Sequence, residues 1–382
     1  MDELASFLAQ RDAQQTRRTL LPVRDRAPGL TATEHFAGVD FSSNDYLGLS
    51  AHPALLAAAH AALERYGCGA GASRLMSGDL QLNHEVEEAL ADFKGTEAAL
   101  LFSTGYQANT GILPALVDRH DVIFADQLSH ASLLDGALLS RAKLLRFRHN
   151  DPDDLAALLA RRRAQFTRAL IVTESIFSMD GDRAPLAQLV DLKERFNCRL
   201  YVDEAHATGI FGAHGAGCVD EDGLTEHVDF IMGTFSKALG SFGAYLATSR
   251  LAVDYLVNTA HSFIYSTALP PAVLAANLAA LRVCREEPAS GQALLRSARE
   301  FRQALVAQGW ATGGASQIIP VQVGESEYAL HLSAALAWQG FRILAIRPPT
   351  VPEGTARLRI SLSAAHTPAQ LAAVLEALRV LA

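Results

Sequence analysis

Leu200-Tyr-Val-Asp-Glu-Ala-His206 is a short apolar run that ends in two acids and a histidine, and the prediction of the fold starts from it. Similar β-rich runs stand before polar turns on both sides of this stretch, and helical stretches separate them. Strands that alternate with helices predict an α/β fold with a mainly parallel sheet covered on both faces. The predicted strands are residues 99–102, 122–125, 143–147, 169–173, 200–202, 230–232 and 244–247.

The same pattern divides the chain into three predicted parts. Residues 1–45 are expected to form an N-terminal arm that begins with a mixed polar helix over residues 5–19. Residues 46–285 carry the alternation and predict a large domain. Residues 286–382 predict a smaller α+β domain, because the alternation stops there. Its expected elements are helices over 289–308 and 328–338, strands over 318–323, 342–346 and 357–362, and a last helix capped by Thr367-Pro368.

Composition narrows the class of protein. Hydrophobic residues make up 49% of the 382 residues and charged residues 19%, so the chain can bury a large core. The net charge of −8, from 33 basic and 41 acidic residues, argues against a protein that binds nucleic acid. The chain contains no apolar run of about 18 residues, so we expect no membrane span.

Cysteine usage and the first residues point to a cytoplasmic enzyme. The four cysteines are scattered, with no CxxC pair and no Cys/His spacing typical of zinc, so neither a metal site nor a disulfide framework is expected. Their low number fits a reducing compartment. Met-Asp-Glu-Leu-Ala at the start is acidic, whereas a signal peptide begins with basic residues.

Lys237 is the candidate nucleophile. It lies in Gly233-Thr-Phe-Ser-Lys-Ala-Leu-Gly240, directly after a predicted strand, whereas the chain's other lysines have charged neighbours. A lysine among small residues at a strand end can lose its hydration, which lowers its pKa and leaves an amine able to attack a carbonyl. The alternative is an ordinary lysine on a surface loop, and the local sequence alone supports both.

Asp203 and His206 follow the predicted strand that ends at Val202. An aspartate at a buried strand tip is costly unless it meets a cation. A protonated pyridine nitrogen is such a cation, and an aspartate facing it is typical of pyridoxal phosphate enzymes with a lysine Schiff base. The alternative is that Asp203 caps the following turn and that His206 is a satisfied buried histidine. Lys237, which follows a later predicted strand, favours the interpretation that Asp203 faces a cofactor.

Ser103-Thr-Gly-Tyr-Gln-Ala-Asn109 supplies a predicted phosphate site. It begins a helix directly after the strand over residues 99–102, and free backbone N–H groups at a helix start bind phosphate. Thr234 and Ser236, just before Lys237 in the same segment, add hydroxyl groups. The sequence therefore predicts all three parts of a pyridoxal phosphate site: an amine, an acid for the ring nitrogen, and a phosphate cradle.

Four motifs together resemble the α-oxoamine synthases, a family of fold-type I pyridoxal phosphate enzymes. They are Thr-Phe-Ser-Lys237, Val-Asp203-Glu-Ala-His206, Leu-Ser-His130-Ala-Ser and Phe-Ser178-Met-Asp-Gly-Asp. Within the family the chain is most similar to the member of the biotin pathway, because of segments 41–49 and 346–359. The similarity covers nearly the whole chain. It implies a large domain with a mainly parallel seven-stranded sheet and a smaller C-terminal α+β domain.

The resemblance implies a role for each catalytic residue. Lys237 would hold pyridoxal 5'-phosphate as a Schiff base and move the Cα proton of the substrate. Asp203 would keep the pyridine nitrogen protonated, and His206 would hydrogen-bond the phenolic oxygen of the ring. His130 would stack on the ring and position the substrate, and Ser178 would lie close to the same ring.

The resemblance also implies the surroundings of the phosphate and a homodimer. Ser266 and Thr267 would reach the phosphate of the partner subunit, so that each site would need both chains. The cofactor cradle within one chain would contain Gly105, Tyr106, Thr234 and Ser236.

Five residues are implied for the substrates. Asn44 and Arg347 would hold the carboxylate of the amino acid, because a guanidinium pairs with a carboxylate through two N–H groups. Arg18 and Thr350 would contact the acyl substrate. Glu174 would lie near the reacting centre.

The expected reaction is a decarboxylating condensation of L-alanine with a pimeloyl thioester, with release of CO2 and the thiol carrier. The carrier, coenzyme A or acyl carrier protein, is left open. One alternative is a sister enzyme that joins glycine or serine to another acyl-CoA. A second is a catalytically idle protein of the same fold, which the retention of Lys237, Asp203 and His206 disfavours. A nicotinamide oxidoreductase is the third, but the glycine-rich residues 67–71 follow a predicted helix over residues 53–66 and not a strand.

Overall fold

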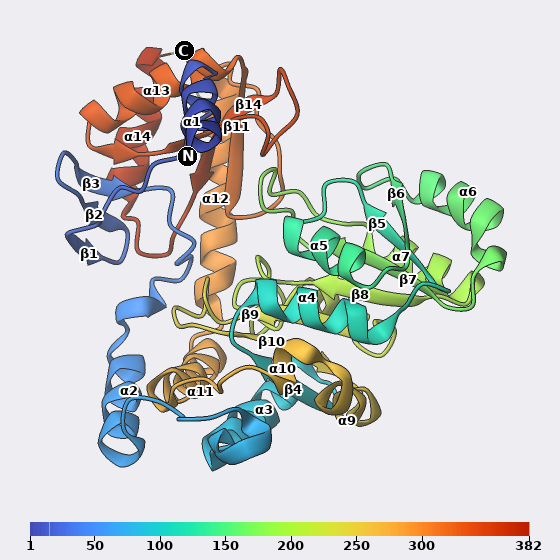
Figure 1. Ribbon diagram of the computed structural model, residues 1–382. Helices are drawn as coiled ribbons and strands as arrows, with labels where there is room; N and C mark the ends of the chain where they lie inside the picture. Colours follow the sequence, from blue (N-terminus) through green and yellow to red (C-terminus); the bar gives the residue numbers. More distant parts are fainter. Residues whose placement is uncertain (15, 382) are drawn as a thin grey trace.

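The computed structural model describes residues 1–14 and 16–381, and a seven-stranded sheet lies at its centre (Figure 1). The strand order is β4-β10-β9-β8-β7-β5-β6. β10 is antiparallel to both of its neighbours, and the other neighbouring pairs are parallel. The predicted mainly parallel sheet is therefore confirmed. The strands are β4 (Ala98–Phe102), β5 (Val122–Asp126), β6 (Lys143–Phe147), β7 (Ala169–Glu174), β8 (Arg199–Asp203), β9 (Phe230–Thr234) and β10 (Ala244–Thr248).

Helices cover both faces of this sheet because its strands point alternate side chains to opposite faces. On β8, Leu200 and Val202 belong to one cluster of buried side chains, and Tyr201 belongs to the other. The surrounding helices are α2 (Pro53–Tyr66), α3 (Gln81–Lys94), α4 (Gly105–Leu116), α5 (Ala131–Leu139), α6 (Pro152–Arg162), α7 (Leu186–Arg195), α8 (Cys218–Glu221), α9 (Arg250–Thr259), α10 (His261–Ile264) and α11 (Pro271–Glu286). Short helical turns are η1 (Leu49–Ala51), η2 (Arg74–Gly78) and η3 (Arg163–Gln165).

The C-terminal part contains a three-stranded antiparallel sheet in the order β11-β14-β13. The strand predicted over residues 342–346 is wrong in one respect, because residues 341–342 and 344–346 belong to different sheets. The buried Ile343 lies where the chain passes from one sheet to the other. The elements are α12 (Ala289–Ala307), β11 (Ile318–Gly324), α13 (Ser326–Trp338), β12 (Phe341–Arg342), β13 (Leu344–Ile346), β14 (Ala356–Ser361) and α14 (Pro368–Leu381).

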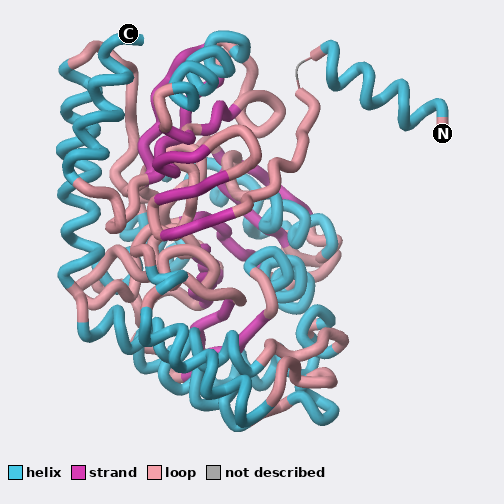
Figure 2. Tube along the Cα trace, turned by 90° about the vertical axis from the view of Figure 1, so that its left-hand side faces the viewer, coloured by secondary structure: helices cyan, strands magenta, loops and turns pink. Residues whose placement is uncertain are grey.

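The N-terminal segment forms more than an arm. Helix α1 spans Asp2–Ala13, so the predicted helix ends early and leaves Arg18 outside it. The cause is local: the carbonyl of Arg11 accepts the N–H of Thr16, which turns the chain out of the helix. Figure 2 shows α1 standing away from the rest of the chain. Three strands then form a sheet with β12: β1 (Asp25–Ala27), β2 (Leu30–Ala32) and β3 (Ala37–Asp40).

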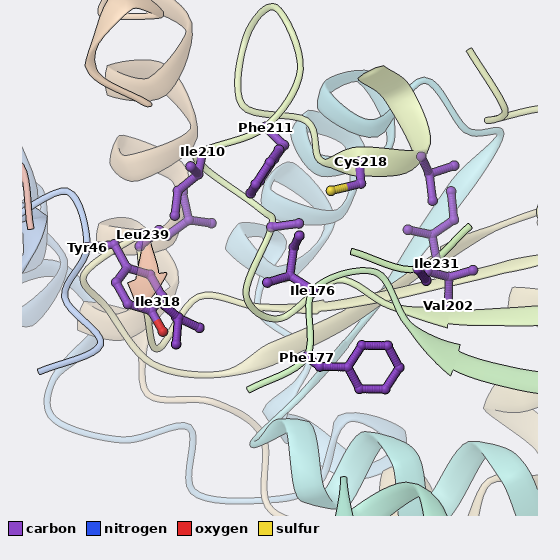
Figure 3. Packing of buried hydrophobic residues seen from close by; sticks show 14 of the residues in the cluster. Tyr46, Ile176, Phe177, Val202, Ile210, Phe211, Cys218, Ile231, Leu239 and Ile318 are labelled. Atoms are coloured by element: carbon purple, nitrogen blue, oxygen red, sulfur yellow. The ribbon is translucent and has the colours of Figure 1, made fainter. Parts of the chain in front are cut away.

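One cluster of fully buried side chains joins these parts of the molecule. Figure 3 shows Tyr46, Leu239 and Ile318 close together, although they come from the N-terminal segment, the loop after Lys237 and β11. Burial of such side chains is the main stabilising term of a core. This core therefore holds the C-terminal sheet and the N-terminal segment against the carboxyl ends of the central strands.

Candidate active site

The carboxyl ends of three adjacent strands bring the predicted catalytic residues together. Glu174 ends β7, Asp203 ends β8, and Thr234 ends β9 shortly before Lys237. Glu174 and Asp203 are direct partners in the register of β7 and β8. Ligands of parallel sheets bind beyond this edge, so the fold places these side chains where a cofactor is expected.

A chain of hydrogen bonds leads from Lys237 to Asn44. Lys237 Nζ lies 2.8 Å from His206 Nε2, and His206 Nδ1 lies 2.7 Å from the hydroxyl of Tyr46. Tyr46 donates to Asn44 Oδ1 at 2.9 Å. Because that carbonyl oxygen can only accept, Tyr46 accepts from His206 Nδ1–H, and Nε2 is left as an acceptor for Lys237. The imidazole is neutral, since burial and then the charges of Lys237 and Arg359 hold the pKa of His206 well below its usual value.

Lys237 has the environment of a reactive amine. Burial lowers its pKa to about 8, against the opposing charges of Asp203 and Glu174, and Arg359 lowers it further. A neutral imidazole, not a carboxylate, is its hydrogen-bond partner. A lysine with such a lowered pKa has a usable fraction of neutral amine near pH 7, as covalent catalysis requires.

Neutral donors hold the carboxylate of Asp203. Its Oδ1 accepts the N–H of Ala205 at 2.9 Å, so the alternative that Asp203 caps the following turn also holds. Its Oδ2 accepts from Asn109 Nδ2 at 3.0 Å, and Asn109 in turn accepts from the hydroxyl of Tyr201 at 2.7 Å. A buried carboxylate with neutral partners favours a cationic ligand, and a protonated ring nitrogen fits this requirement.

Glu174 supports the segment that carries His130. The backbone N–H of His130 donates to Glu174 Oε1 at 2.6 Å, and His130 Nδ1 lies 2.8 Å from Ser132 Oγ. Burial, and then the charge of Asp203, raise the pKa of Glu174 to about 8. Glu174 lies beside Asp203 in the register of the sheet, and its expected place near the reacting centre stays a prediction.

The start of α4 forms a cradle that fits a phosphate group. Thr104 caps this helix, and the hydroxyl oxygen of Thr234 is buried without a hydrogen-bond partner among the described residues. A Cβ atom at Gly105 would lie 2.9 Å from the side chain of Thr234, so the backbone approaches closely there. A buried hydroxyl without a partner, next to free N–H groups at a helix start, suits a bound phosphate.

The remaining cradle residues lie around this helix start. Tyr106 is exposed and donates to Asp135, and Ser236 is exposed beside Lys237. Ser266 accepts from Gln107 of α4 in the same chain, and Thr267 follows it. The contact of Ser266 and Thr267 with the phosphate of a partner subunit stays a prediction.

Arg359 on β14 is a site residue that the sequence analysis missed. Its Nε donates to the carbonyl of Ser178 at 2.6 Å, its Nη1 to Ser361 Oγ at 2.7 Å, and both Nη atoms to Asn44 Oδ1 at 3.3 Å. Only 7% of the residue is exposed, and its hydrogen-bond partners among the described residues are all neutral. A buried guanidinium without a carboxylate partner favours an anionic ligand.

The outer predicted substrate residues lie around the proline-rich turn after β13. Arg18 Nη2 donates to Thr350 Oγ1 at 3.3 Å, so the structure brings these two residues together. Arg347 lies at the start of the turn and lines a surface pocket with Arg11 and Thr16 of the N-terminal segment. The predicted role of Arg347 in binding the amino-acid carboxylate stays a prediction.

The family model of class I and II aminotransferases matches residues 37–378. The 8-amino-7-oxononanoate synthase of Anaeromyxobacter dehalogenans is 48% identical over 379 residues, which cover 99% of this chain and 95% of that protein.

Two solved structures are similar over most of the chain. A serine palmitoyltransferase variant of S. paucimobilis, solved with a bound pyridoxal phosphate–myriocin aldimine, has a TM-score of 0.93 and 32% identity, covering 99% of this chain and 96% of its own. The 8-amino-7-oxononanoate synthase of Francisella tularensis has a TM-score of 0.79 and 30% identity, covering 90% of this chain and 97% of its own.

The fold, the site and these similarities agree. The chain has the fold-type I architecture, and its cofactor is pyridoxal phosphate. The resemblance stated from the motifs is confirmed by relatives that match nearly the full length. The chain belongs to the class I and II aminotransferase family and, within it, to the 8-amino-7-oxononanoate synthases.

Proposed function

We propose that this enzyme condenses L-alanine with a pimeloyl thioester and releases CO2 and the thiol carrier. A carbon–carbon bond forms between the alanine Cα and the acyl carbon, the carbon–sulfur bond breaks, and the alanine carboxylate leaves as CO2. The observation that carries the proposal is one site in which a reactive lysine, a carboxylate with neutral partners and a buried arginine lie together.

Bound pyridoxal phosphate supplies an electron sink for the negative charge that develops at Cα. Lys237 holds the cofactor, and its neutral amine takes the Cα proton of alanine and later returns a proton there. Asp203 keeps a proton on the ring nitrogen. The neutral His206, fixed by Tyr46, orients Lys237 Nζ.

Arg359 is the proposed anchor for the alanine carboxylate, together with Asn44. The two residues are already in contact, and Ser178 fixes the third nitrogen of the guanidinium from the other side. A carboxylate bound by a guanidinium fixes the amino acid in one orientation. Arg347, the anchor expected from sequence, is the competing candidate.

A cavity of about 400 Å³ beside the site suits the acyl chain. Its walls include the apolar side chains of Phe177, Met179 and Val351, and it reaches Thr350, which contacts Arg18. We propose that the methylene chain lies against these apolar walls. Arg18 and Thr350 then bind the free carboxylate at its far end, because a cation suits that charge.

We also propose a homodimer. Tyr265, directly before Ser266, is 78% exposed. Met76 is 80% exposed and lies three residues after Ser73, which pairs with Thr267. Large exposed apolar side chains favour a protein interface, and a second copy of this chain fits the predicted shared phosphate site.

A cytoplasmic location is part of the proposal as well, and it rests on the sparse cysteines. Among the described residues, no helix is long and apolar enough to span a membrane.

A substrate panel tests the reaction. We expect kcat/KM to be highest for L-alanine with pimeloyl-CoA or pimeloyl-acyl carrier protein, with a product mass equal to both substrates less CO2 and thiol. Glycine or serine, paired with acetyl, succinyl or palmitoyl thioesters, are the matched alternatives. A methyl group is worth only about 1–3 kcal/mol in a pocket, so slow turnover of glycine agrees with the proposal. A higher kcat/KM for any of the other pairs overturns it in favour of a sister enzyme.

Two conservative variants separate the candidate carboxylate anchors. Arg359→Lys should raise KM for alanine more than Arg347→Lys does, because a lysine cannot keep the forked contacts with Asn44 and Ser178. KM for the acyl thioester should change little in Arg359→Lys. The opposite order of KM values for alanine would assign the anchor to Arg347.

A further inference from the structure

A histidine held between two carboxylates lies outside the set of catalytic side chains. His149 follows β6, and its Nδ1 lies 2.9 Å from Asp126 Oδ1 while its Nε2 lies 2.7 Å from Asp182 Oδ2. Burial lowers the pKa of His149, but its hydrogen bonds to the two aspartates outweigh this and raise the pKa to about 10. Both ring nitrogens donate, and the imidazolium balances two acids that would otherwise repel each other.

The two aspartates belong to different segments. Asp126 ends β5 of the central sheet, where it also accepts the N–H groups of Leu128 and Asn150 at 2.8 Å. Asp182 closes the loop of residues 177–182, in which Phe177 N–H donates to the Asp182 carbonyl at 3.0 Å. His149 therefore ties this loop to the end of a central strand.

The loop in turn touches the C-terminal part. The carbonyl of Gly181 accepts from Ala315 N–H and from Ser316 Oγ, both at 2.8 Å. A Cβ atom at Gly181 would lie 2.1 Å from the carbonyl oxygen of Ile318, so the loop fits closely against β11. Within the same loop, the carbonyl of Ser178 accepts from Arg359 Nε at 2.6 Å.

We propose that His149 is a positioning residue that orients Arg359 through Asp182 and the loop of residues 177–182. The loop carries the carbonyl that fixes one edge of the guanidinium, and His149 fixes the loop to the central sheet. Loss of the imidazolium leaves Asp126 and Asp182 without their shared cation, so the loop moves and Arg359 turns away from the amino acid. The inference rests on the proposed role of Arg359 as the carboxylate anchor.

The test measures binding of L-alanine to the holoenzyme without an acyl substrate. The variants are His149→Phe, which keeps the ring volume, Asp182→Asn, which keeps the shape, and the double variant. A spectral titration with alanine should show a dissociation constant raised roughly tenfold or more in each single variant, since small misplacements of a positioned group are costly. The double variant should bind no more weakly than the singles, because both substitutions break one unit. Bound pyridoxal phosphate should stay at wild-type stoichiometry.

Arg168 offers a matched control at the amino ends of the central strands, because it directly precedes β7. Its Nη2 lies 2.9 Å from Asp118 Oδ2 and 2.7 Å from Asp121 Oδ2, so it too is a cation between two aspartates. Arg168→Gln should lower the melting temperature and leave alanine binding unchanged. Unchanged alanine binding in both His149→Phe and Asp182→Asn, or an equal loss in Arg168→Gln, overturns the proposal.

The results that would contradict this inference differ from those that would contradict the proposed function. A wild-type enzyme that binds alanine but forms no product with any pimeloyl thioester contradicts the proposed reaction only. If His149→Phe does not fold, alanine binding by Asp182→Asn alone tests the inference. This variant is expected to fold, because an amide of the same shape still accepts from Asn150.

Discussion

Two lysines near the end of β8 have opposite environments. Lys94, at the end of α3, is 2% exposed and donates to the carboxylate of Glu204 and to the carbonyl of Ala216. Lys237 lies beside the neutral His206. Burial acts to lower the pKa of both amines, but the charge of Glu204 raises the pKa of Lys94 above its usual value, whereas the pKa of Lys237 falls to about 8.

The difference shows that the neighbouring group, and not burial, decides whether a lysine is structural or reactive. Asp203 and Glu204 are adjacent in sequence, so the strand end points them in different directions. Glu204 meets Lys94 and forms a closed ion pair. Asp203 meets neutral donors, which leaves its charge for the cofactor. Lys237 has a neutral imidazole and no direct carboxylate partner among the residues that the structure describes.

Lys237→Ala tests the reactive side of this comparison. We expect kcat/KM to fall about a thousandfold or more, because the variant loses both the covalent attachment and the group that moves the proton. Borohydride reduction followed by peptide mass spectrometry should find no lysine that carries pyridoxal phosphate. A reduced adduct on Lys94 in this variant would contradict the assignment of Lys94 as structural and Lys237 as reactive. In the control variant Lys94→Met, the adduct should stay on Lys237.

Lys94→Met tests the structural side. It leaves Glu204 buried without a counter-charge, and we expect a loss of about 3–5 kcal/mol in the free energy of unfolding, measured with urea. The double variant Lys94→Met with Glu204→Gln should regain part of that loss, since no buried charge is left unpaired. If the double variant is no more stable than Lys94→Met, the loss of stability in Lys94→Met does not come from the unpaired charge of Glu204.

Asp203→Asn and Glu204→Gln compare the two neighbouring acids directly. Asp203→Asn should slow exchange of the alanine Cα proton with D2O roughly a hundredfold, because a neutral amide does not hold a proton on the ring nitrogen. NMR of alanine with the holoenzyme gives this rate without any acyl substrate. Glu204→Gln should leave the exchange rate within a few-fold of wild type and should lower stability instead. Similar exchange rates in the two variants would contradict the separation of roles.

The pH dependence of cofactor attachment gives the smallest expected effect. An amine attacks in its neutral form, so attachment of pyridoxal phosphate to the cofactor-free chain should rise about tenfold per pH unit below pH 8 and level off above it. The sign follows from the lowered pKa of Lys237. Half of the amine is neutral at a pH of about 8, whereas an ordinary lysine reaches that fraction only at its usual, higher pKa. Stopped-flow absorbance measures the rate, and a rise that continues to pH 10 would mean that Lys237 has an ordinary pKa.

The local pattern of apolar and polar residues was enough to predict much of the fold. Each of the seven predicted central strands lies within one strand of the structure, because runs of apolar residues between turns report local backbone preference and burial. Thr367 accepts the N–H of Gln370 at 3.2 Å, as the predicted cap of the last helix requires. The strand over 342–346 was mispredicted because its first residue, Arg342, pairs with Asp40, which is distant in sequence.

The sequence by itself determined the parallel sheet, the strand-end positions of Asp203 and Lys237 and the helix start that fits a phosphate, because these depend on local periodicity and spacing. Only the tertiary structure decided that Arg359 faces Asn44, that Tyr46 fixes His206 and that Lys94 is paired with Glu204. These contacts join residues far apart in the chain, and alternation along a strand shows which residues share a face without showing what that face meets. The partner of a buried charge is set by how the elements pack, and that partner fixes its chemistry.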